Sequence, residues 1–406
     1  MHILIVTDQH PESLGGVQVA IRMQRRALER LGHRVTVAAP ALHRLGYSMA
    51  EPDRDAYIDL PSRPITRDRE YSLTWPGRSA DRRFANALAT RPPVDLVHVQ
   101  GDFWGAMIGV RAARGLRVPI VHTMHNHVDE GTRAVTPLAP LAFAGLRAWR
   151  RLVLGRPRGG VDPASRGAWR YLAELAADAD AVTAPSQHFA EALRRHGVSS
   201  TVLVTPNGVD DEAVAAVREV PRSERTRPKL VWLGRMSHEK RVLEFIDAIA
   251  LSGIDADIAL HGAGLLLPRV EERIAALGLA DRVSIPGPVP YPAALAALRD
   301  ADALVQTSIG FETQGLTPFE AAALGTPTIF SDAEIAADVD VDQKWVVADG
   351  SVAALARALR EAAAELAAAP GARRVDASAA TRFLQSARSG EMLAVYESVL
   401  SADRSA

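Results

Sequence analysis

Short apolar runs alternate with longer amphipathic segments along this chain, and the alternation starts afresh near the middle. This pattern is typical of parallel α/β architecture, in which buried strands are separated by helices. The 406 residues are too many for one core and suit two domains of roughly 200 residues each. The expected strands are 3–6, 34–38, 96–99, 120–123, 181–184 and 202–205 in the first half, and 229–233, 258–261, 283–285, 303–306 and 327–330 in the second.

The domain boundary is expected near residue 208, after the turn Pro206–Asn207–Gly208–Val209. Residues 210–227 are charged and irregular, so they are expected to form a connector between the halves. The alanine-rich tail after residue 350 is expected to be helical and to pack back on the first domain. We therefore predict domains at 1–208 and 209–384, followed by a returning C-terminal helix at 385–406.

Composition narrows the possible functions. The net charge of −1 gives the whole molecule no attraction to nucleic acid, so any attraction to an anionic surface must come from a local patch. The absence of cysteine excludes disulfides, thiolate metal sites and cysteine nucleophiles. The first residues resemble a buried strand and not a signal peptide, and no uncharged apolar run approaches the ~20 residues that span a bilayer. We expect a cytoplasmic protein, soluble or peripheral on the membrane, from a GC-rich bacterium.

Ligands of parallel sheets bind beyond the carboxyl ends of the strands. In the first half, Gly15 and Gly16 lie between the first strand and its helix, where bare backbone amides can approach a phosphate or a sugar. The three spaced glycines of a dinucleotide fingerprint are missing, which argues against a nicotinamide cofactor. A plain tight turn explains these two glycines equally well.

In the second half, Arg235 and Lys240 follow the first strand and precede a helix. Cations placed there can neutralise a diphosphate, including the charge that develops on it as it leaves. A solvated charged loop is the alternative for these two residues considered alone.

Glu312 lies in a glycine-flanked loop after a strand, and Glu320 lies on the helix that follows. Carboxylates accept hydrogen bonds from paired hydroxyls, so these two can hold a sugar ring and a ribose. Between them, the backbone amides of Gly315 and Leu316 at the helix start can donate hydrogen bonds to phosphate oxygens.

His122, His125 and His127 follow another first-half strand. A metal site is disfavoured because only Asp129 and Glu130 are near enough to support it, and we predict none. A hydrogen bond from His125 to a sugar hydroxyl or an acceptor is the favoured role, and the other two histidines are expected to be structural. No Ser–His–Asp arrangement or phosphate-binding P-loop can be assembled from the motifs.

Residues 138–154 form an expected amphipathic helix. Arg147, Arg150 and Arg151 fall on one side of the helical wheel, and Trp149 falls on the apolar side. Such a helix can lie on an anionic leaflet, or it can be a core helix with a solvated arginine face. The apolar side contains Leu138, Leu141, Ala142, Leu146, Trp149, Leu152 and Val153, whereas Phe143 and Leu154 fall among the arginines.

Together these motifs resemble glycosyltransferase family 4, a large retaining family of the GT-B fold. The resemblance implies two Rossmann-like domains that face each other across a deep cleft holding a nucleotide-sugar donor. It covers nearly the whole chain, and its specificity comes from the order and spacing of modest motifs. They are Gly-Gly-Val at 15–17, Val-His-Thr-Met-His at 121–125, Thr-Ala-Pro-Ser at 183–186, Pro-Asn-Gly-Val-Asp at 206–210, Gly-Arg-Met-Ser-His-Glu-Lys at 234–240, His-Gly-Ala-Gly at 261–264 and the Glu312 to Glu320 block.

The resemblance implies roles for these residues. Arg235 and Lys240 would hold the donor diphosphate, Glu312 the sugar hydroxyls and Glu320 the ribose, while His125 would contact the sugar near the reacting carbon. Catalysis in the family is metal-independent and retains the anomeric configuration, and the leaving phosphate is proposed to take the acceptor proton. No cofactor is implied, because the UDP- or GDP-sugar is a substrate. Further donor-binding positions are Gly15, Gly16, Gly262, Thr313, Gln314, Gly315 and Leu316.

Within the family, Glu-Thr-Gln-Gly-Leu at 312–316 and the basic helix in 138–170 resemble bacterial diacylglycerol glucosyltransferases, which favours transfer of a hexose to a membrane glycerolipid. One departure is Phe-Ser-Asp-Ala-Glu-Ile at 330–335, where the family often has a Gly-Gly pair before an acidic residue. The loop 286–291 is expected to contact the nucleobase. The alternatives are the same chemistry on a soluble sugar, inositol or secondary metabolite, a non-catalytic two-lobed sugar-binding protein, and a sugar epimerase.

Overall fold

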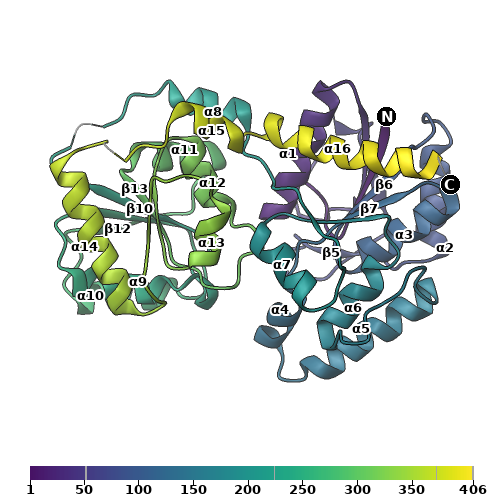
Figure 1. Ribbon diagram of the computed structural model, residues 1–406, viewed down its shortest axis with the longest axis horizontal. Helices are drawn as coiled ribbons and strands as arrows, with labels where there is room; N and C mark the ends of the chain where they lie inside the picture. Colours follow the sequence, from purple (N-terminus) through teal and green to yellow (C-terminus); the bar gives the residue numbers. More distant parts are fainter. Residues whose placement is uncertain (51–52, 224, 372, 405–406) are drawn as a thin grey trace. The chain divides into compact units, whose positions relative to one another are not determined.

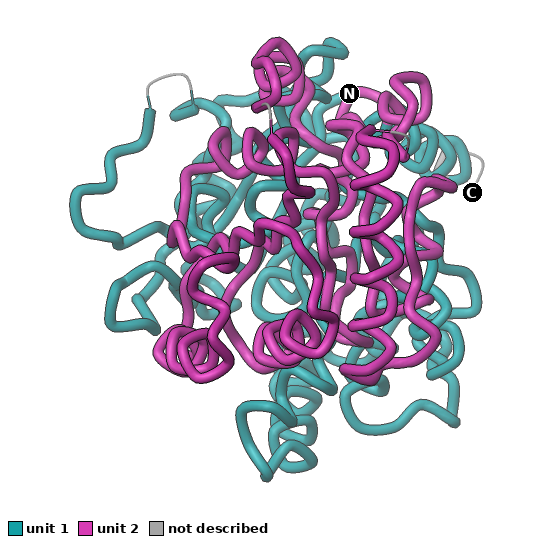
Figure 2. Tube along the Cα trace, turned by 90° about the vertical axis from the view of Figure 1, so that its left-hand side faces the viewer, with its two compact units in different colours: residues 1–207, 388–406 teal, residues 208–387 magenta. Residues whose placement is uncertain are grey.

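The structure is a computed structural model that describes residues 1–50, 53–223, 225–371 and 373–404. The chain forms two compact units, coloured separately in Figure 2. Unit 1 contains Met1–Asn207 and Arg388–Ala406, and unit 2 contains Gly208–Ala387. The sequence-based prediction had placed these boundaries at 208/209 and 384/385.

Unit 1 is built on a parallel sheet with the strand order β3-β2-β1-β6-β7-β8-β9. Its strands β6 and β7 are labelled in Figure 1. The interior strand β1 is buried along its whole length, as expected for a parallel sheet covered by helices on both faces. Ile3 of β1 pairs with Val35 of β2 on one side and with Leu96 of β6 on the other. The strands are β1 (His2–Thr7), β2 (Arg34–Pro40), β3 (Tyr57–Leu60), β6 (Leu96–Gln100), β7 (Ile120–Thr123), β8 (Ala181–Ala184) and β9 (Leu203–Val204).

Helices cover both faces of this sheet. One face packs against α2 (Arg78–Leu88), α3 (Trp104–Leu116), α5 (Ala139–Leu154), α6 (Gly167–Ala176) and α7 (Gln187–Arg195). The opposite face packs against α1 (Gly16–Arg30) and the C-terminal helix α16 (Gln385–Arg404), both labelled in Figure 1. The remaining helix is α4 (Val128–Val135).

The predicted return of the C-terminal helix to the first domain is confirmed. Met392, Val395, Tyr396 and Val399 of α16 are buried in one cluster with Ile3 and other residues of the unit 1 sheet. The Tyr396 hydroxyl also lies 2.7 Å from Nδ1 of the buried His98 on β6. The last helix is therefore part of the core of unit 1.

Unit 2 has a second parallel sheet, with the strand order β12-β11-β10-β13-β14-β15. Its strands are β10 (Lys229–Leu233), β11 (Asp257–His261), β12 (Val283–Gly287), β13 (Ala303–Gln306), β14 (Thr328–Phe330) and β15 (Lys344–Val346). One face packs against α9 (Val242–Ser252), α10 (Leu267–Ala276) and α14 (Val352–Ala368), and the other against α8 (Asp211–Arg218), α11 (Tyr291–Asp300) and α12 (Leu316–Ala323). Shorter elements are η2 (His238–Lys240), α13 (Ala333–Asp338), α15 (Ala377–Ala380) and η3 (Thr381–Phe383).

The prediction of an irregular connector at 210–227 is wrong for its first half. Residues Asp211–Arg218 form α8, whose first turn is capped by the Asp210 carboxylate accepting from the Ala213 amide at 3.0 Å. Val214 and Val217 are buried with residues of α11 and α12, so α8 belongs to the core of unit 2. The high charge of the segment had concealed these two apolar positions.

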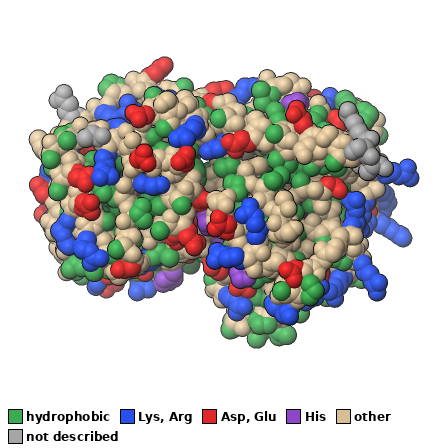
Figure 3. Space-filling model, viewed as in Figure 1, with side chains coloured by type: hydrophobic (Ala, Val, Ile, Leu, Met, Phe, Trp, Pro, Cys, Tyr) green, Lys and Arg blue, Asp and Glu red, His purple; other side chains and the backbone are tan. Residues whose placement is uncertain are grey.

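The surface carries charges of both signs. Acidic and basic side chains are interspersed over the face seen in Figure 3, in keeping with the net charge of −1. Within the described part of the chain, no helix combines the length and the apolar character that crossing a bilayer requires.

Candidate active site

The structure brings together two predicted site residues of unit 2, Lys240 and Glu312. Lys240 Nζ forms an ion pair with Glu312 Oε1, although the two residues are 72 positions apart. Glu312 is only 9% exposed, and its Oε1 also accepts a hydrogen bond from Ser308 Oγ at 2.8 Å. A partly buried cation and a buried carboxylate therefore meet just beyond the carboxyl ends of β10 and β13, where ligands of parallel sheets bind.

The backbone of Lys240 is fixed by the sheet beneath it. The Thr307 hydroxyl donates to the Lys240 carbonyl oxygen and accepts from Trp232 Nε1 at 2.9 Å. Trp232 is buried in β10, and Thr307 directly follows β13. The position of the cation is thus coupled to the packing of two central strands.

Arg235 forms a different ion pair. Its side chain is 69% exposed and pairs with Glu239 at 3.3 Å, within its own loop. An exposed guanidinium can reorient toward a bound anion. The contact of Arg235 with the diphosphate therefore stays a prediction.

Gly262 follows β11 with φ at 140°, a conformation that favours glycine. A Cβ atom at this position would lie 1.9 Å from the Gly234 carbonyl oxygen. The Gly262 amide donates to the Gly287 carbonyl at 3.0 Å. Glycine is therefore required at 262 by the close approach of the Gly234 carbonyl oxygen, just after the neighbouring strand β10.

The loop between β13 and α12 contains the other predicted donor residues. Gly315 caps α12, so the amides of Leu316 and the residues after it form the helix start, where anions are stabilised. Thr313 and Gln314 lie in the same loop, and Gln314 is 8% exposed. Glu312 is therefore connected to a helix N-terminus by only three residues.

Glu320 lies on α12 in a poorly solvated position. Burial raises its pKa to about 7, and the nearby Tyr291 hydroxyl opposes the rise. Burial and the charge of Glu320 in turn raise the pKa of Tyr291. Tyr291 begins α11, so it places a hydroxyl beside the carboxylate predicted to bind ribose. The sequence had included Tyr291 only as the end of a nucleobase loop.

In unit 1, a buried carboxylate organises the predicted histidine loop. Asp102 Oδ2 accepts from the backbone amide of His125 at 3.0 Å and from Asn126 Nδ2 at 2.7 Å. His122 Nε2 lies 3.4 Å from Asp102 Oδ1 and 2.9 Å from the Gly101 carbonyl. Asp102 had not been singled out from the sequence, although it lies in one of the expected ligand-binding loops.

His125 itself is buried, and its Nε2 lies 3.1 Å from Gln100 Oε1. Burial lowers its pKa to about 4; the charge of Asp102 opposes this shift, and that of His122 adds to it. The ring is therefore neutral near pH 7. With Nε2 donating to Gln100, Nδ1 is an acceptor.

The other histidine of this loop packs against aromatic rings. The ring of His127 lies 4.8 Å from that of Phe189 and 6.4 Å from that of Trp169, measured between centroids. Among the described residues, no group of three or more histidine, aspartate or glutamate side chains is arranged to hold a metal ion.

A second carboxylate missed from the sequence is Asp8, at the end of β1. It accepts from the amides of Asp102, Phe103 and Gly105 at 2.7, 3.1 and 2.6 Å, so it caps the start of α3. Burial and the charge of Asp102 raise the pKa of Asp8 to about 7. The signal in the sequence is an aspartate directly after the first strand, next to the predicted glycine loop.

The glycine loop connects Asp8 to α1. Gly15 caps α1 with φ at 141°, and a Cβ atom there would lie 2.2 Å from Gln18 Oε1. Nothing described lies within 4 Å of a Cβ atom built on Gly16, so the first residue of α1 is open to a ligand.

The helix predicted at 138–154 is present as α5, but its faces were assigned only partly correctly: Leu146, Trp149 and Val153 of the predicted apolar side do pack against the core. Arg150 is fully buried, where it pairs with the buried Asp178 and donates to the Gly155 carbonyl at 2.7 Å. Arg147 and Arg151 pair with the buried Glu174 at 3.2 and 2.8 Å. Glu174 on α6 and Asp178 just after it thus hold the arginine-bearing side of α5 toward the protein. Phe143 and Leu154, on the same side of α5, are buried. On the predicted apolar side, Leu138, Leu141 and Leu152 are 62%, 69% and 82% exposed.

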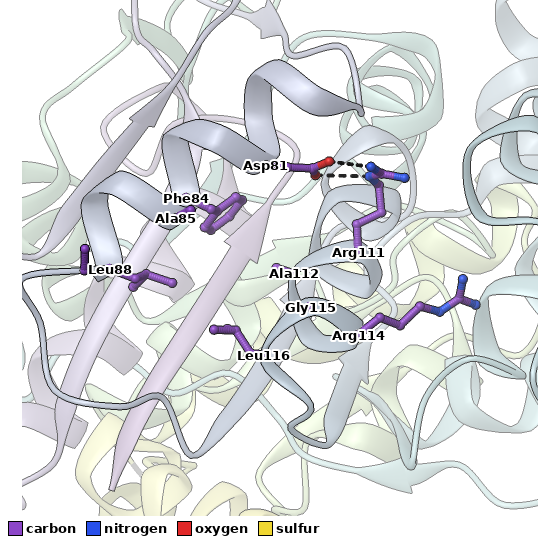
Figure 4. A pocket seen from close by; sticks show the side chains of 10 residues that line it. Asp81, Phe84, Ala85, Leu88, Arg111, Ala112, Arg114, Gly115 and Leu116 are labelled. Atoms are coloured by element: carbon purple, nitrogen blue, oxygen red, sulfur yellow. Dashed lines mark hydrogen bonds and ion pairs between the residues drawn. The ribbon is translucent and has the colours of Figure 1, made fainter.

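Trp149 of α5 is partly buried and contacts Trp75, with the ring centroids 5.2 Å apart. A cavity of about 650 Å³ lies between α2 and α3, lined at one side by the Asp81–Arg111 ion pair and at the other by Phe84, Leu88 and Leu116 (Figure 4). None of the predicted catalytic or donor-binding residues is in its described lining.

Two family models together match most of the chain. Residues 14–213 match the model of Glycosyltransferase Family 4, and residues 214–369 match that of Glycosyl transferases group 1. The chain is a glycosyltransferase with a Family 4 domain followed by a group 1 domain. It is therefore an enzyme that uses a nucleotide sugar, and its two parallel α/β units form the predicted GT-B fold.

Curated relatives of this glycosyltransferase act on different acceptors. The chain is 25% identical to an alpha-monoglucosyldiacylglycerol synthase of Streptococcus pneumoniae, over 81% of this chain and 70% of the relative. It is 26% identical to a phosphatidyl-myo-inositol mannosyltransferase of Mycobacterium leprae, over 85% and 83% of the two chains. It is also 26% identical to a 2-deoxystreptamine glucosyltransferase of Streptomyces kanamyceticus, over 85% and 88%.

Solved structures support the fold. A sucrose-phosphate synthase from Thermosynechococcus elongatus has a TM-score of 0.68 at 20% identity, with 99% of each chain covered. The Anabaena protein HepE in complex with UDP has a TM-score of 0.67 at 18% identity, with 98% of this chain and 100% of that chain covered.

Proposed function

We propose that this glycosyltransferase moves a hexosyl group from a UDP- or GDP-sugar to a hydroxyl of a membrane glycerolipid, with retention of configuration and without a metal ion. The observation that carries the proposal is the ion pair of Lys240 with the buried Glu312, three residues before the N-terminus of α12. This arrangement offers a cation and helix amides to a diphosphate, and a carboxylate to sugar hydroxyls.

The ion pair suggests how the donor binds. Lys240 and Glu312 neutralise each other while the site holds no donor. A diphosphate then replaces Glu312 as the partner of Lys240, and the released carboxylate accepts hydrogen bonds from the transferred sugar. Each group exchanges one partner for another, so neither is left buried and unpaired.

The chemical step breaks the bond between C1 of the sugar and the phosphate oxygen, and forms a bond from C1 to the acceptor oxygen. Negative charge grows on the departing diphosphate, where Lys240, Arg235 and the amides of Gly315 and Leu316 stabilise it. The proton of the acceptor hydroxyl passes to the leaving phosphate oxygen. This route requires no protein nucleophile.

Unit 1 is proposed to contribute two contacts. The neutral His125 would accept a hydrogen bond from a sugar hydroxyl at Nδ1, and the backbone amide of the exposed Gly16 would donate to the nucleotide sugar. His125→Ala should lower turnover. His125→Gln, which keeps an acceptor, should retain more of it.

A lipid acceptor is supported by two of the relatives and by the surface of α5. Leu138, Leu141 and Leu152 are exposed there, and Arg151 is 54% exposed on the same helix. Exposed leucines beside arginine suit the headgroup region of an anionic membrane, at its cytoplasmic face. Replacing the three leucines by serine should weaken sedimentation with anionic liposomes and slow transfer to a lipid. Transfer to a soluble acceptor should be unaffected.

The alternative acceptor is a soluble amino sugar or polyol, because one of the relatives glucosylates 2-deoxystreptamine. A direct test incubates the enzyme with each of several nucleotide sugars and with one of three acceptor conditions. The conditions are diacylglycerol in mixed micelles, a panel of soluble acceptors, and no acceptor. Nucleoside diphosphate release that requires diacylglycerol supports the proposal, whereas release that requires a soluble acceptor refutes the lipid part. Conversion of the nucleotide sugar without any acceptor would indicate an epimerase. Binding of the nucleotide sugar without release of nucleoside diphosphate would indicate a sugar-binding protein. EDTA and the anomeric NMR signal of the product test metal independence and retention.

A further inference from the structure

The short hairpin of β4 (Arg63–Pro64) and β5 (Ser72–Leu73) is connected by hydrogen bonds to the glycine loop of unit 1. The backbone amide of Leu14 donates to Glu70 Oε1 at 2.7 Å, and the backbone carbonyl of Leu14 accepts from the Tyr71 hydroxyl at 3.0 Å. Two consecutive residues of the hairpin thus hold both backbone polar groups of the residue that precedes Gly15.

Glu70 is itself held firmly. Its side chain is only 3% exposed, and Arg44 Nη1 donates to Oε1 and Oε2 at 3.1 and 3.2 Å. A third connection lies nearby, where the Ser72 amide donates to Gln9 Oε1 at 2.9 Å. The hairpin therefore contacts the loop at two places, Gln9 and Leu14.

The contacts of Glu70 and Tyr71 fix the backbone of Leu14 and do not bury the Leu14 side chain. Leu14 is 66% exposed, and Gly15 and Gly16 are exposed as well. Gly15 then adopts a φ of 141° and leads directly into α1. His10 and Ser13, earlier in the same loop, are buried, so the exposed part is its end at 14–16, and the hairpin holds both backbone polar groups of Leu14 there.

We propose that Glu70 is a positioning residue for the transfer reaction, which holds Leu14–Gly16 in the conformation that presents the Gly16 amide to the donor. The inference rests on the proposed function, because that function assigns the Gly16 amide to donor binding. Without Glu70 the Leu14 amide loses its acceptor and the loop relaxes. A misplacement of about 1 Å at a binding group can cost up to about 100-fold in rate.

The test compares Glu70→Ala, Glu70→Gln and Tyr71→Phe with Asp81→Ala as the matched control. Asp81 is also a carboxylate of unit 1 paired with an arginine, but it lies on α2 beside Arg111, outside the predicted site loops. Glu70→Ala should lower kcat/KM for the donor at least tenfold, mainly through KM, with the acceptor KM unchanged. Glu70→Gln should lose less, because its amide oxygen still accepts from Leu14, and Tyr71→Phe should change in the same direction.

Hydrogen exchange of a peptide covering residues 12–16 gives a readout that does not depend on turnover. It should be faster in Glu70→Ala than in the wild type and unchanged in Asp81→Ala. Wild-type kcat/KM in Glu70→Ala, or an equal loss in Asp81→Ala, would overturn the inference. If Glu70→Ala does not fold, Glu70→Gln and Tyr71→Phe decide by the same criteria. If the wild type turns over no nucleotide sugar, the proposed function is refuted, and so is the positioning role of Glu70 in transfer. Faster hydrogen exchange in Glu70→Ala would in that case show only that Glu70 holds the loop.

Discussion

Glu320→Gln should make the protein more stable above pH 7 while impairing transfer. Burial raises the pKa of Glu320 from 4.5 to about 7, so the folded protein carries its ionised form at a cost. At about 1.4 kcal/mol for each pKa unit, the rise of roughly 2.5 units corresponds to about 3–4 kcal/mol once the group is fully ionised. Glutamine has the same shape and no charge, so it removes the cost.

The sign of the pH dependence follows from proton linkage. Below about pH 4.5 the carboxyl is protonated in both the folded and the unfolded chain, and the substitution should change stability little. Between pH 4.5 and 7 the unfolded chain releases its proton first, so the wild type loses stability as the pH rises. The stability advantage of Glu320→Gln should therefore grow through this window and level off above pH 7.

Thermal unfolding measured from pH 4.5 to 8.5 checks this prediction, with Glu271→Gln as the control at an exposed position of unit 2. For a unit of this size, each kcal/mol corresponds to about 2–4 °C in Tm. The same variant should bind the donor more weakly, because ribose hydroxyls lose a charged acceptor worth about 1.5–3 kcal/mol. A Tm difference that is constant over this range, or equal in Glu271→Gln, would refute the reasoning about burial.

Three further changes test other parts of the structure. Lys240→Ala should lower kcat about 100- to 1000-fold with an unchanged circular dichroism spectrum, because a cation is lost from the leaving diphosphate; turnover like that of the wild type would disprove its role. Gly262→Ala should lower Tm, since its Cβ would lie 1.9 Å from the Gly234 carbonyl oxygen and strain of this kind costs about 1–3 kcal/mol; an unchanged Tm in calorimetry would contradict this close approach. Asp178→Ala should cost about 3–5 kcal/mol in denaturant unfolding, because the buried Arg150 loses its partner; a loss below about 1 kcal/mol would mean that water reaches Arg150.

The central strands of both sheets could be predicted because each is an unbroken apolar run, as in β1 and β10. The strands β3 and β15 were missed because charged residues, Asp59 in β3 and Lys344 in β15, interrupt or shorten their apolar runs. The hairpin of β4 and β5 was missed because its strands, Arg63–Pro64 and Ser72–Leu73, form no apolar run, although it holds the glycine loop. Helix α8 was missed because only two of its residues are buried.

The predicted site loops lie at the carboxyl ends of the strands, but contacts between distant residues depend on the strand order. Lys240 meets Glu312 because β13 lies beside β10, which no local pattern reveals. The helical wheel of α5 failed in part for a related reason. A wheel ranks faces by hydrophobicity alone, whereas Asp178 and Glu174 supply buried partners for its arginines.

A crystal structure of the protein with a nucleoside diphosphate tests most directly whether unit 2 binds the donor through Lys240 and α12. We predict phosphate oxygens within hydrogen-bonding distance of Lys240 Nζ and the Leu316 amide, the ribose on Glu320, and the Lys240–Glu312 ion pair broken. A nucleotide bound elsewhere, or a diphosphate in this site with the ion pair intact, would contradict the account.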